Sequence, residues 1–264
     1  MIDNIMNELF FDHYRDNRGE LDLAPNFSNQ GVLFETLEKN RNNCLIRSGV
    51  NILTIRLLLA QDSFRRLQDY EQRYKRLSGD YIVKDPVTAL SGVVAPILSP
   101  YNFIGEEIKT ETIRAHEYFY SFLTSAVSAL DRLANEIDSI YELNIRKVDW
   151  GSLKNGFSAL ESTNSNLKQY LTTVMSESNQ DVKLLFDYRN IAEHEGAVII
   201  EEFSRGRITM TDSYTIKVQS DPRDPNSTIN RELVNTCRIF FCLVVNICDR
   251  VYDLIAQNLF NVQT

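Results

Sequence analysis

Histidine is scarce in this sequence, and the motifs of several common enzyme folds are missing. The three histidines, His13, His116 and His194, lie far apart in the chain, which argues against a histidine-rich metal site. The sequence contains neither G-x-x-x-x-G-K-[ST] nor G-x-G-x-x-G, so it lacks the glycine loops that cradle nucleotide phosphates. It also contains neither H-E-x-x-H nor G-x-S-x-G, which argues against zinc proteases and α/β-hydrolases.

Cysteine, proline and glycine are few, and no apolar run is long. The four cysteines match no zinc-binding spacing, and six prolines and ten glycines leave little room for long linkers. The longest apolar run, Ile239 to Val245, is far too short to span a bilayer. The N-terminal residues include no basic segment of the kind that opens a signal peptide. We therefore expect a cytoplasmic protein with no membrane partner.

Positive charge is concentrated in one segment of an acidic chain. The formal net charge is -8, which argues weakly against a general nucleic-acid coat protein. The segment from Lys39 to Arg76 nevertheless holds nine basic and three acidic residues. Within it, Arg66 and Arg73 lie seven apart beside an apolar stripe, where they are candidates for binding nucleic-acid phosphates. The alternative, which we favour, is that they pair with Asp62 and Asp69.

Apolar residues recur every three or four positions through most of the chain, which predicts a mostly α fold. The expected helices are 2–13, 28–43, 48–77, 110–143, 150–162, 166–175, 184–196 and 228–258. Gly79 is expected to end the third of them. Three prolines in 81–105 indicate a long connection, so we expect a helical region in 1–105 and a bundle in 106–264, or one continuous domain.

Two segments depart from a simple helical pattern. Residues 198–203 and 207–218 are rich in β-branched residues and flank a turn, which predicts a small β-hairpin. The helix after it carries apolar residues on two faces, which is typical of a helix that is central in a bundle or buried in a dimer. On the helix over 110–143, His116 is expected in the core and Asp131 in a surface ion pair.

The densest group of chemically useful residues lies late in the helix expected over 184–196. Arg189, Asn190 and His194 fall in its last turns, and Gly196 suits the position after a helix end. Residues three and four apart share a face, which places 183, 187, 190 and 194 on one polar strip and 182, 185, 188 and 192 on the apolar one. Arg189 borders the apolar side and therefore needs a partner or a cleft. A plain alternative is an arginine in an ion pair and a histidine cation favoured by the helix dipole.

The segment Arg189-Asn-Ile-Ala-Glu-His194 resembles the R-x(4–6)-H signature of HEPN domains, a group of helical proteins that includes many prokaryotic ribonucleases. In that family the motif lies late on a helix of a bundle, between two long amphipathic helices. The resemblance covers roughly residue 110 to the C-terminus and implies a HEPN-like helical bundle with a small β-hairpin insertion.

The resemblance implies a metal-independent endoribonuclease with no cofactor, in which the 2′-hydroxyl of the RNA attacks the adjacent phosphorus. His194 would then transfer protons, Arg189 would bind the phosphate, and Asn190 would orient one of them. Two alternatives stay open. One is a non-catalytic helical module that binds nucleic acid or a nucleotide, and the other is a helical dimer with an interaction role.

The spacing of the motif also bears on assembly. On a straight α-helix, residues five apart point about 140° away from each other, so one chain would hardly place Arg189 and His194 on one phosphate. We therefore expect a homodimer in which each site combines Arg189 of one chain with His194 of the other.

Overall fold

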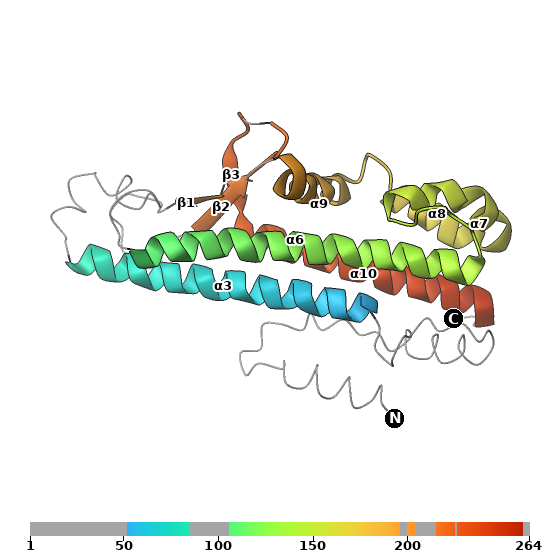
Figure 1. Ribbon diagram of the computed structural model, residues 1–264, viewed down its shortest axis with the longest axis horizontal. Helices are drawn as coiled ribbons and strands as arrows, with labels where there is room; N and C mark the ends of the chain where they lie inside the picture. Colours follow the sequence, from blue (N-terminus) through green and yellow to red (C-terminus); the bar gives the residue numbers. More distant parts are fainter. Residues whose placement is uncertain (1–51, 85–105, 196–199, 204–214, 225, 261–264) are drawn as a thin grey trace, which may run out of the picture. The chain divides into compact units, whose positions relative to one another are not determined.

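The computed structural model describes residues 52–84, 106–195, 200–203, 215–224 and 226–260, and within these residues the chain is mostly helical with one small sheet (Figure 1). The helices expected over 2–13 and 28–43 and most of the connection expected over 81–105 lie outside the described residues. No helix among the described segments combines the length and the apolar character that crossing a bilayer requires.

Three long helices carry the apolar stripes that the sequence predicts: α3 (Ile52–Lys84), α6 (Glu106–Tyr141) and α10 (Leu233–Phe260). Buried residues on these stripes are Leu57, Phe64 and Leu67 of α3, Leu123, Leu130 and Ile137 of α6, and Cys237, Val244, Cys248 and Ile255 of α10. Burial raises the pKa of the Cys237 and Cys248 thiols, as expected of cysteines that act as small apolar residues.

Two expectations about these long helices are wrong. α3 continues through Gly79 to Lys84, since one glycine inside a helix costs only about 1 kcal/mol relative to alanine. His116 is half-buried rather than in the core, and its ring meets the edge of the Tyr120 ring at 6.1 Å between centroids.

Short helices follow α6: η3 (Gly151–Gly156), α7 (Phe157–Thr163) and α8 (Ser165–Val174). Asn164 caps α8 by accepting a hydrogen bond of 3.1 Å from the Leu167 amide. Asp131 is half-buried and accepts a hydrogen bond of 2.9 Å from the Trp150 amide at the start of η3, while its expected surface ion pair stays a prediction. The side chain therefore fixes the turn that leads out of α6.

The sheet has three antiparallel strands in the order β1 (Ile200–Phe203), β2 (Thr215–Gln219) and β3 (Ile229–Glu232). Strands β1 and β2 pair antiparallel as predicted, with Ile200 opposite Val218 and Phe203 opposite Thr215. The expected turn at 204–206 and the expected strand residues 207–214 lie outside the described residues. The third strand lies within the range 228–258 in which the sequence predicts a helix, so the start of that prediction is wrong. That helix begins at Leu233, directly after β3.

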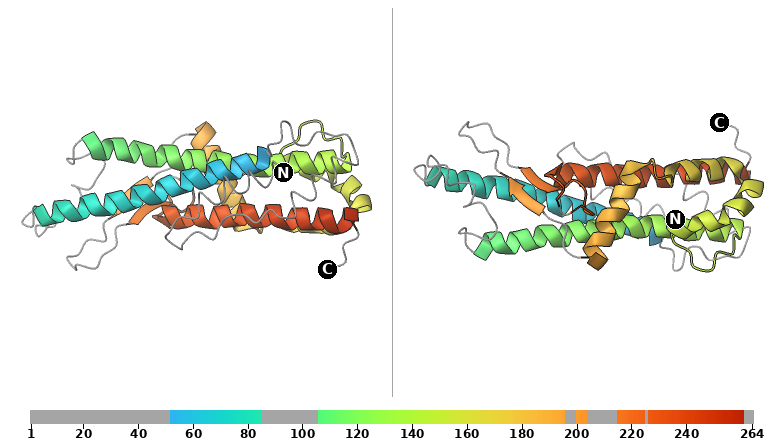
Figure 2. Two further views of the ribbon diagram at one scale, coloured as in Figure 1. Left: turned by 90° about the horizontal axis from the view of Figure 1, so that it is seen from below. Right: turned by 90° about the horizontal axis from the view of Figure 1, so that it is seen from above.

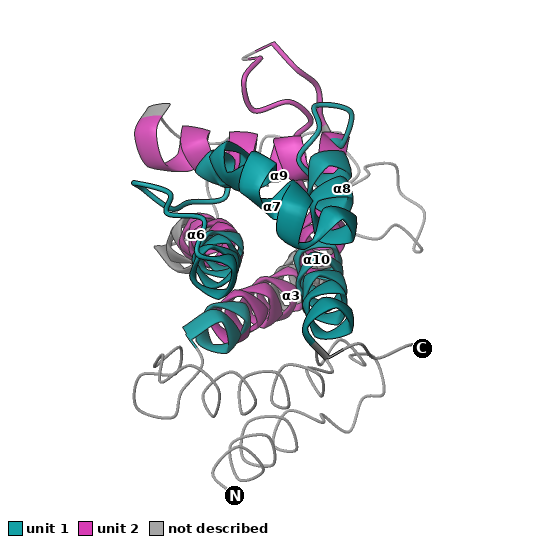
Figure 3. Ribbon diagram, turned by 90° about the vertical axis from the view of Figure 1, so that its right-hand side faces the viewer, with its two compact units in different colours: residues 1–57, 128–179, 242–264 teal, residues 58–127, 180–241 magenta. Residues whose placement is uncertain are grey.

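The chain divides into two compact units, drawn in different colours in Figure 3. Among the described residues, unit 1 comprises 52–57, 128–179 and 242–260, and unit 2 comprises 58–84, 106–127, 180–195, 200–203, 215–224 and 226–241. Each long helix therefore contributes residues to both units. The boundary expected at residue 105 borders residues outside the described range and stays a prediction.

Candidate functional site

The helix that carries the motif, α9 (Gln180–Asn190), is anchored in unit 2 by Tyr188. Its side chain is fully buried, and its ring lies 5.7 Å from the Phe119 ring of α6 and 6.0 Å from the Phe240 ring of α10. The Tyr188 hydroxyl donates a hydrogen bond to the Gln219 carbonyl of β2, and burial raises the pKa of this phenol. Figure 2 shows α9 lying across α6 and α10. These contacts hold the residues next to Tyr188 in a defined place.

Asp187 also anchors α9, contrary to its expected place on the polar strip. Its carboxylate is almost fully buried and accepts a hydrogen bond of 2.6 Å from Nε of Arg223, in the turn after β2. A buried carboxylate requires such a partner, because an isolated charge in the interior is costly. Asp187 is therefore not available to a solute, and the chemically available groups lie at the end of the helix.

The last turn of the motif is a π-helix, η4 (Ile191–Glu195), that continues directly from α9. A π-helix closes its hydrogen bonds between residues five apart, so residues i and i+5 become neighbours on its surface. Arg189 and His194 are five apart. The α-helical geometry that separates them by about 140° therefore does not apply here, and the geometric reason for a site shared between two chains no longer holds.

Glu193 brings the motif residues together within one chain. Its Oε2 lies 2.8 Å from Nη2 of Arg189 and 3.8 Å from Nε2 of His194. Its Oε1 accepts a hydrogen bond of 2.9 Å from the hydroxyl of Thr124 on α6. We call these residues, together with Asn190, the Glu193 cluster. An arginine and a histidine thus lie against a single carboxylate oxygen.

The side chains of the Glu193 cluster differ in exposure. The imidazole of His194 is 64% exposed, whereas the side chains of Arg189 and Glu193 are 29% and 27% exposed. Nη1 of Arg189 donates a hydrogen bond of 3.1 Å to Oδ1 of Asn190, and its buried Nε has no acceptor among the described residues. Asn190 therefore fixes the plane of the guanidinium, while His194 is open to a solute.

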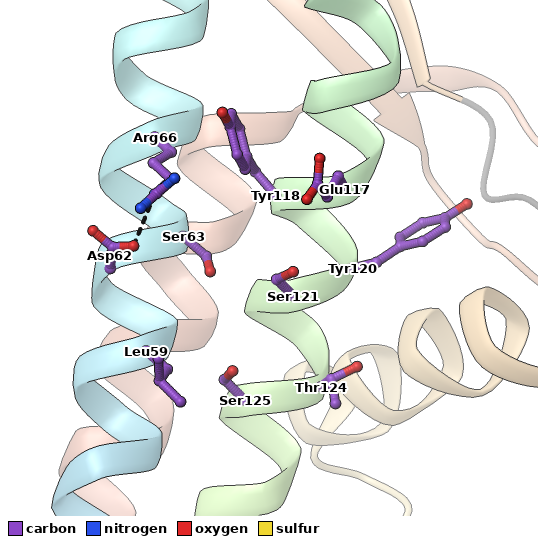
Figure 4. A pocket seen from close by; sticks show the side chains of 10 residues that line it. All are labelled: Leu59, Asp62, Ser63, Arg66, Glu117, Tyr118, Tyr120, Ser121, Thr124 and Ser125. Atoms are coloured by element: carbon purple, nitrogen blue, oxygen red, sulfur yellow. Dashed lines mark hydrogen bonds and ion pairs between the residues drawn. The ribbon is translucent and has the colours of Figure 1, made fainter.

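A groove of about 490 Å³ lies along α3 and α6 in unit 2 (Figure 4). Its lining is mainly hydroxyl, aromatic and carboxyl side chains: Leu59, Asp62, Ser63, Arg66, Glu117, Tyr118, Tyr120, Ser121, Thr124 and Ser125. We call it the Arg66 groove. Thr124 belongs both to this lining and to the Glu193 cluster. The groove and the motif are consequently parts of one region.

Arg66 is held in this groove by two neighbours. Its Nε lies 2.8 Å from Oδ2 of Asp62, and its guanidinium carbon lies 5.7 Å from the centre of the Tyr118 ring. The hydrogen bond and the charge of Asp62 raise the pKa of Arg66. The expected ion pair with Asp62 is confirmed. Arg73 lies in α3, but its side chain is outside the described part of the chain.

A second cluster of titratable groups is enclosed in unit 1. The carboxyl of Glu136 accepts a hydrogen bond of 2.6 Å from the hydroxyl of Tyr252 and lies 3.5 Å from Nε of Arg132. Burial raises the pKa of Glu136 to about 7. Since Glu136 is almost inaccessible to solvent, this cluster bears on stability rather than on contact with a solute.

Sequence reasoning identified Arg189, Asn190 and His194 but missed Glu193 and Thr124. The spacing of Arg189 and Glu193, four apart, was a signal of their ion pair. Nothing in the sequence indicated that Thr124, 69 positions earlier, would reach the same carboxylate. Within the described ranges, no three His, Cys, Asp or Glu side chains gather as metal ligands.

Comparison of the chain with protein-family models, with curated proteins and with solved structures finds no match.

Proposed function

We propose that this protein is an endoribonuclease that cleaves RNA through attack of a 2′-hydroxyl on the adjacent phosphorus, on a HEPN-like helical bundle. The observation that carries the proposal is the contact of Arg189 and His194 with one oxygen of Glu193 in the same chain. A carboxylate oxygen and a phosphate oxygen accept hydrogen bonds from the same donors, so the position of Glu193 Oε2 marks where an RNA phosphate would bind.

Each residue of the motif has a role in this reaction. Arg189 binds the phosphate through its planar donors and stabilises the charge that develops on it. Asn190 holds the guanidinium in place through the 3.1 Å hydrogen bond to Nη1. His194, the exposed group, accepts the proton of the 2′-hydroxyl and returns a proton to the departing 5′-oxygen. The products are a 2′,3′-cyclic phosphate and a 5′-hydroxyl, and the nucleophile belongs to the RNA itself.

The decisive experiment is cleavage of a labelled single-stranded RNA by the wild-type chain and by His194→Ala. We expect the variant to lose at least about a hundredfold in rate, since general acid–base catalysis contributes this much or more. His116→Ala is the matched control, because His116 also lies in unit 2 but outside the Glu193 cluster. Mass spectrometry of the fragments identifies the termini.

Two results would refute the proposal. One is cleavage at a site whose 2′-hydroxyl has been removed, because the attacking group would then be absent. The other is an unchanged rate in His194→Ala. Melting curves of both histidine variants accompany the assay, so that loss of folding is not mistaken for loss of chemistry.

A non-catalytic module that binds nucleic acid is the second candidate. The arrangement of Arg66 over the Tyr118 ring favours it, because aromatic and guanidinium planes are surfaces on which bases stack. Salt-dependent binding of RNA that is never cleaved would select this candidate.

A further inference from the structure

The Arg66 groove is lined by groups that accept hydrogen bonds as well as by groups that donate them. Two carboxylates, Asp62 and Glu117, lie in its wall, and four serine and threonine residues accompany them: Ser63, Ser121, Thr124 and Ser125. Asp62 is occupied by Arg66, whereas the structure gives Glu117, an exposed residue, no partner among the described residues. A phosphate would be repelled by Glu117, so the groove favours a neutral group that carries N–H or O–H donors.

The groove also offers a flat surface. The guanidinium of Arg66 lies over Tyr118, and both groups form part of the lining. In Figure 4, the Tyr118 side chain extends from α6 toward Arg66 on α3. Nucleobases stack on such aromatic and guanidinium planes in proteins that bind single-stranded nucleic acid. A nucleoside combines a flat, neutral base that carries such donors with the hydroxyl groups of its sugar, so it fits this lining.

The Glu193 cluster, which contains the guanidinium of Arg189, lies at the neighbouring position. Thr124 lines the groove and donates to Glu193, which in turn contacts Arg189. A ligand that extends from the groove past Thr124 therefore reaches the Arg189–Glu193 pair, where a phosphate that takes the place of the Glu193 carboxylate would bind the guanidinium. A neutral nucleoside followed by a phosphate is the repeating unit of a nucleic-acid strand.

We propose that the Arg66 groove binds one unpaired nucleoside of the RNA strand, next to the phosphate held by Arg189, and that Glu117 selects guanine there. The base stacks on the pair formed by Arg66 and Tyr118. The two oxygens of Glu117 accept hydrogen bonds from the adjacent N1–H and N2–H₂ donors of guanine, a pair that uracil lacks. A base in a duplex uses these donors for pairing, so the substrate class is single-stranded RNA. This inference rests on the proposed function for the position of the phosphate.

The test is binding of two labelled oligonucleotides that cannot be cleaved, measured by fluorescence anisotropy. One is oligouridylate with a single guanine, the other is oligouridylate alone, and both lack the 2′-hydroxyls that would attack. We expect the wild-type chain to bind the guanine-containing strand about tenfold more tightly. Glu117→Gln should remove most of this ratio. The ratio is the useful quantity, because loss of one negative charge alters general attraction for both strands equally.

Three further variants test separately the stacking ring, its hydroxyl and the effect of net charge. Tyr118→Ala should weaken binding of both strands by about tenfold, and Tyr118→Phe, which keeps the ring, should not. Glu232→Gln is the matched control, since Glu232 is an exposed carboxyl of unit 2 outside the groove lining. Equal affinity of the wild-type chain for both strands, or an unchanged ratio in Glu117→Gln, would overturn guanine selection. Full affinity in Tyr118→Ala at an unchanged melting temperature would overturn the groove itself.

The binding and cleavage assays together distinguish failure of the guanine site from failure of the proposed nuclease. If the groove variants behave as expected but the all-ribose strand is never cut, the nuclease proposal fails and the nucleoside site stands. If the strand is cut through His194 but both oligonucleotides bind alike, the nuclease proposal stands and the guanine site fails.

Discussion

Arg189 and His194, five positions apart in the chain, contact the same carboxylate oxygen of Glu193 at 2.8 and 3.8 Å. Glu193 can contact both because it lies four residues after Arg189, on the same helix face, and directly before His194. The turn that carries Glu193 and His194 is a π-helix. π-Turns inside α-helices are rare and are found frequently at functional sites. The arrangement also means that the protein's own carboxylate occupies the arginine that we assign to the RNA phosphate.

Replacing Glu193 by glutamine should therefore tighten the binding of RNA. The amide keeps the size of the side chain but removes the charge that competes with the phosphate. Partly exposed ion pairs contribute about 0.2 to 1 kcal/mol, so we expect KM for RNA to fall by up to about fivefold. Steady-state kinetics measure this change, with Glu232→Gln as the control for net charge. A rise in KM would show that Glu193 assists substrate binding instead of opposing it.

Arg189 and His194 of one chain should act together, without help from a second copy. Arg189→Ala and His194→Ala proteins are each expected to be inactive, and mixing them should restore nothing even when subunit exchange is verified. A site shared between the chains of a homodimer predicts a different result. Half of the dimers would then be mixed with one intact site each, and activity would return to about a quarter of that of the wild type. The homodimer itself stays a prediction.

Cleavage should persist in an excess of chelator. In the proposed reaction the RNA supplies the nucleophile and His194 moves the protons, so no metal-bound water is required. The rate before and after dialysis against chelator measures this, with added magnesium as the complementary condition. Activity that disappears with chelator and returns with magnesium would contradict the mechanism.

Glu136 should make the protein less stable as the pH rises. Its pKa of about 7 in the folded chain lies above the ordinary value of 4.5, so the folded state binds the proton more tightly than the unfolded chain. The resulting stabilisation is fully present below pH 4.5 and is lost as the pH rises through about 7. Relative to Glu136→Gln, the wild-type chain should therefore lose up to about 3 kcal/mol of unfolding free energy between these limits. Urea denaturation at several pH values measures the difference, and Glu177→Gln, at an exposed position, should show none.

Gly156 and Gly151, at the two ends of η3, should respond differently to alanine. A Cβ at Gly156 would lie 2.8 Å from Cδ1 of Leu143 and 3.1 Å from its Cβ, so the packing would have to move. A Cβ at Gly151 would meet Oδ1 of Asp149 at an ordinary 3.5 Å. We expect Gly156→Ala to cost about 1 to 3 kcal/mol and Gly151→Ala to change stability by less than about 0.5 kcal/mol. Equal stabilities of the two variants would show that this contact is not rigid.

The long helices were predictable because their signal is repeated many times. In α6 the residues at 123, 127, 130, 134 and 137 keep the same spacing, and all of them are buried. Local exceptions were not predictable in this way. The sequence predicts a helix end at Gly79, although α3 continues to Lys84. It also predicts helix over the residues of β3, because a strong apolar pattern follows them directly. A single glycine is tolerated inside a helix, and β3 forms through its pairing with β2, a long-range contact that the local sequence does not show.

The motif was predictable as a set of residues but not as a geometry. The sequence places Arg189 and His194 five apart, and an α-helix would direct them to different sides. The change to a π-turn has no simple signature in the residues from Ile191 to Glu195. Asp187 shows the same limit, because its partner Arg223 lies 36 positions away in a loop. Long-range partners determine which polar side chains remain available for chemistry.

The interleaving of the two units limits how this protein can be dissected. The shortest continuous fragment that contains all of unit 2 is 58–241, and it carries 128–179 of unit 1 with it. Such a fragment would contain Glu136 but not Tyr252, so a buried carboxyl would lose its hydrogen-bond donor. Shortening the chain from either end is thus a poor way to find a minimal active piece. A better approach is to delete 128–179, which belong to unit 1, and to join residue 127 to residue 180 through a designed linker. This deletion removes no residue of unit 2.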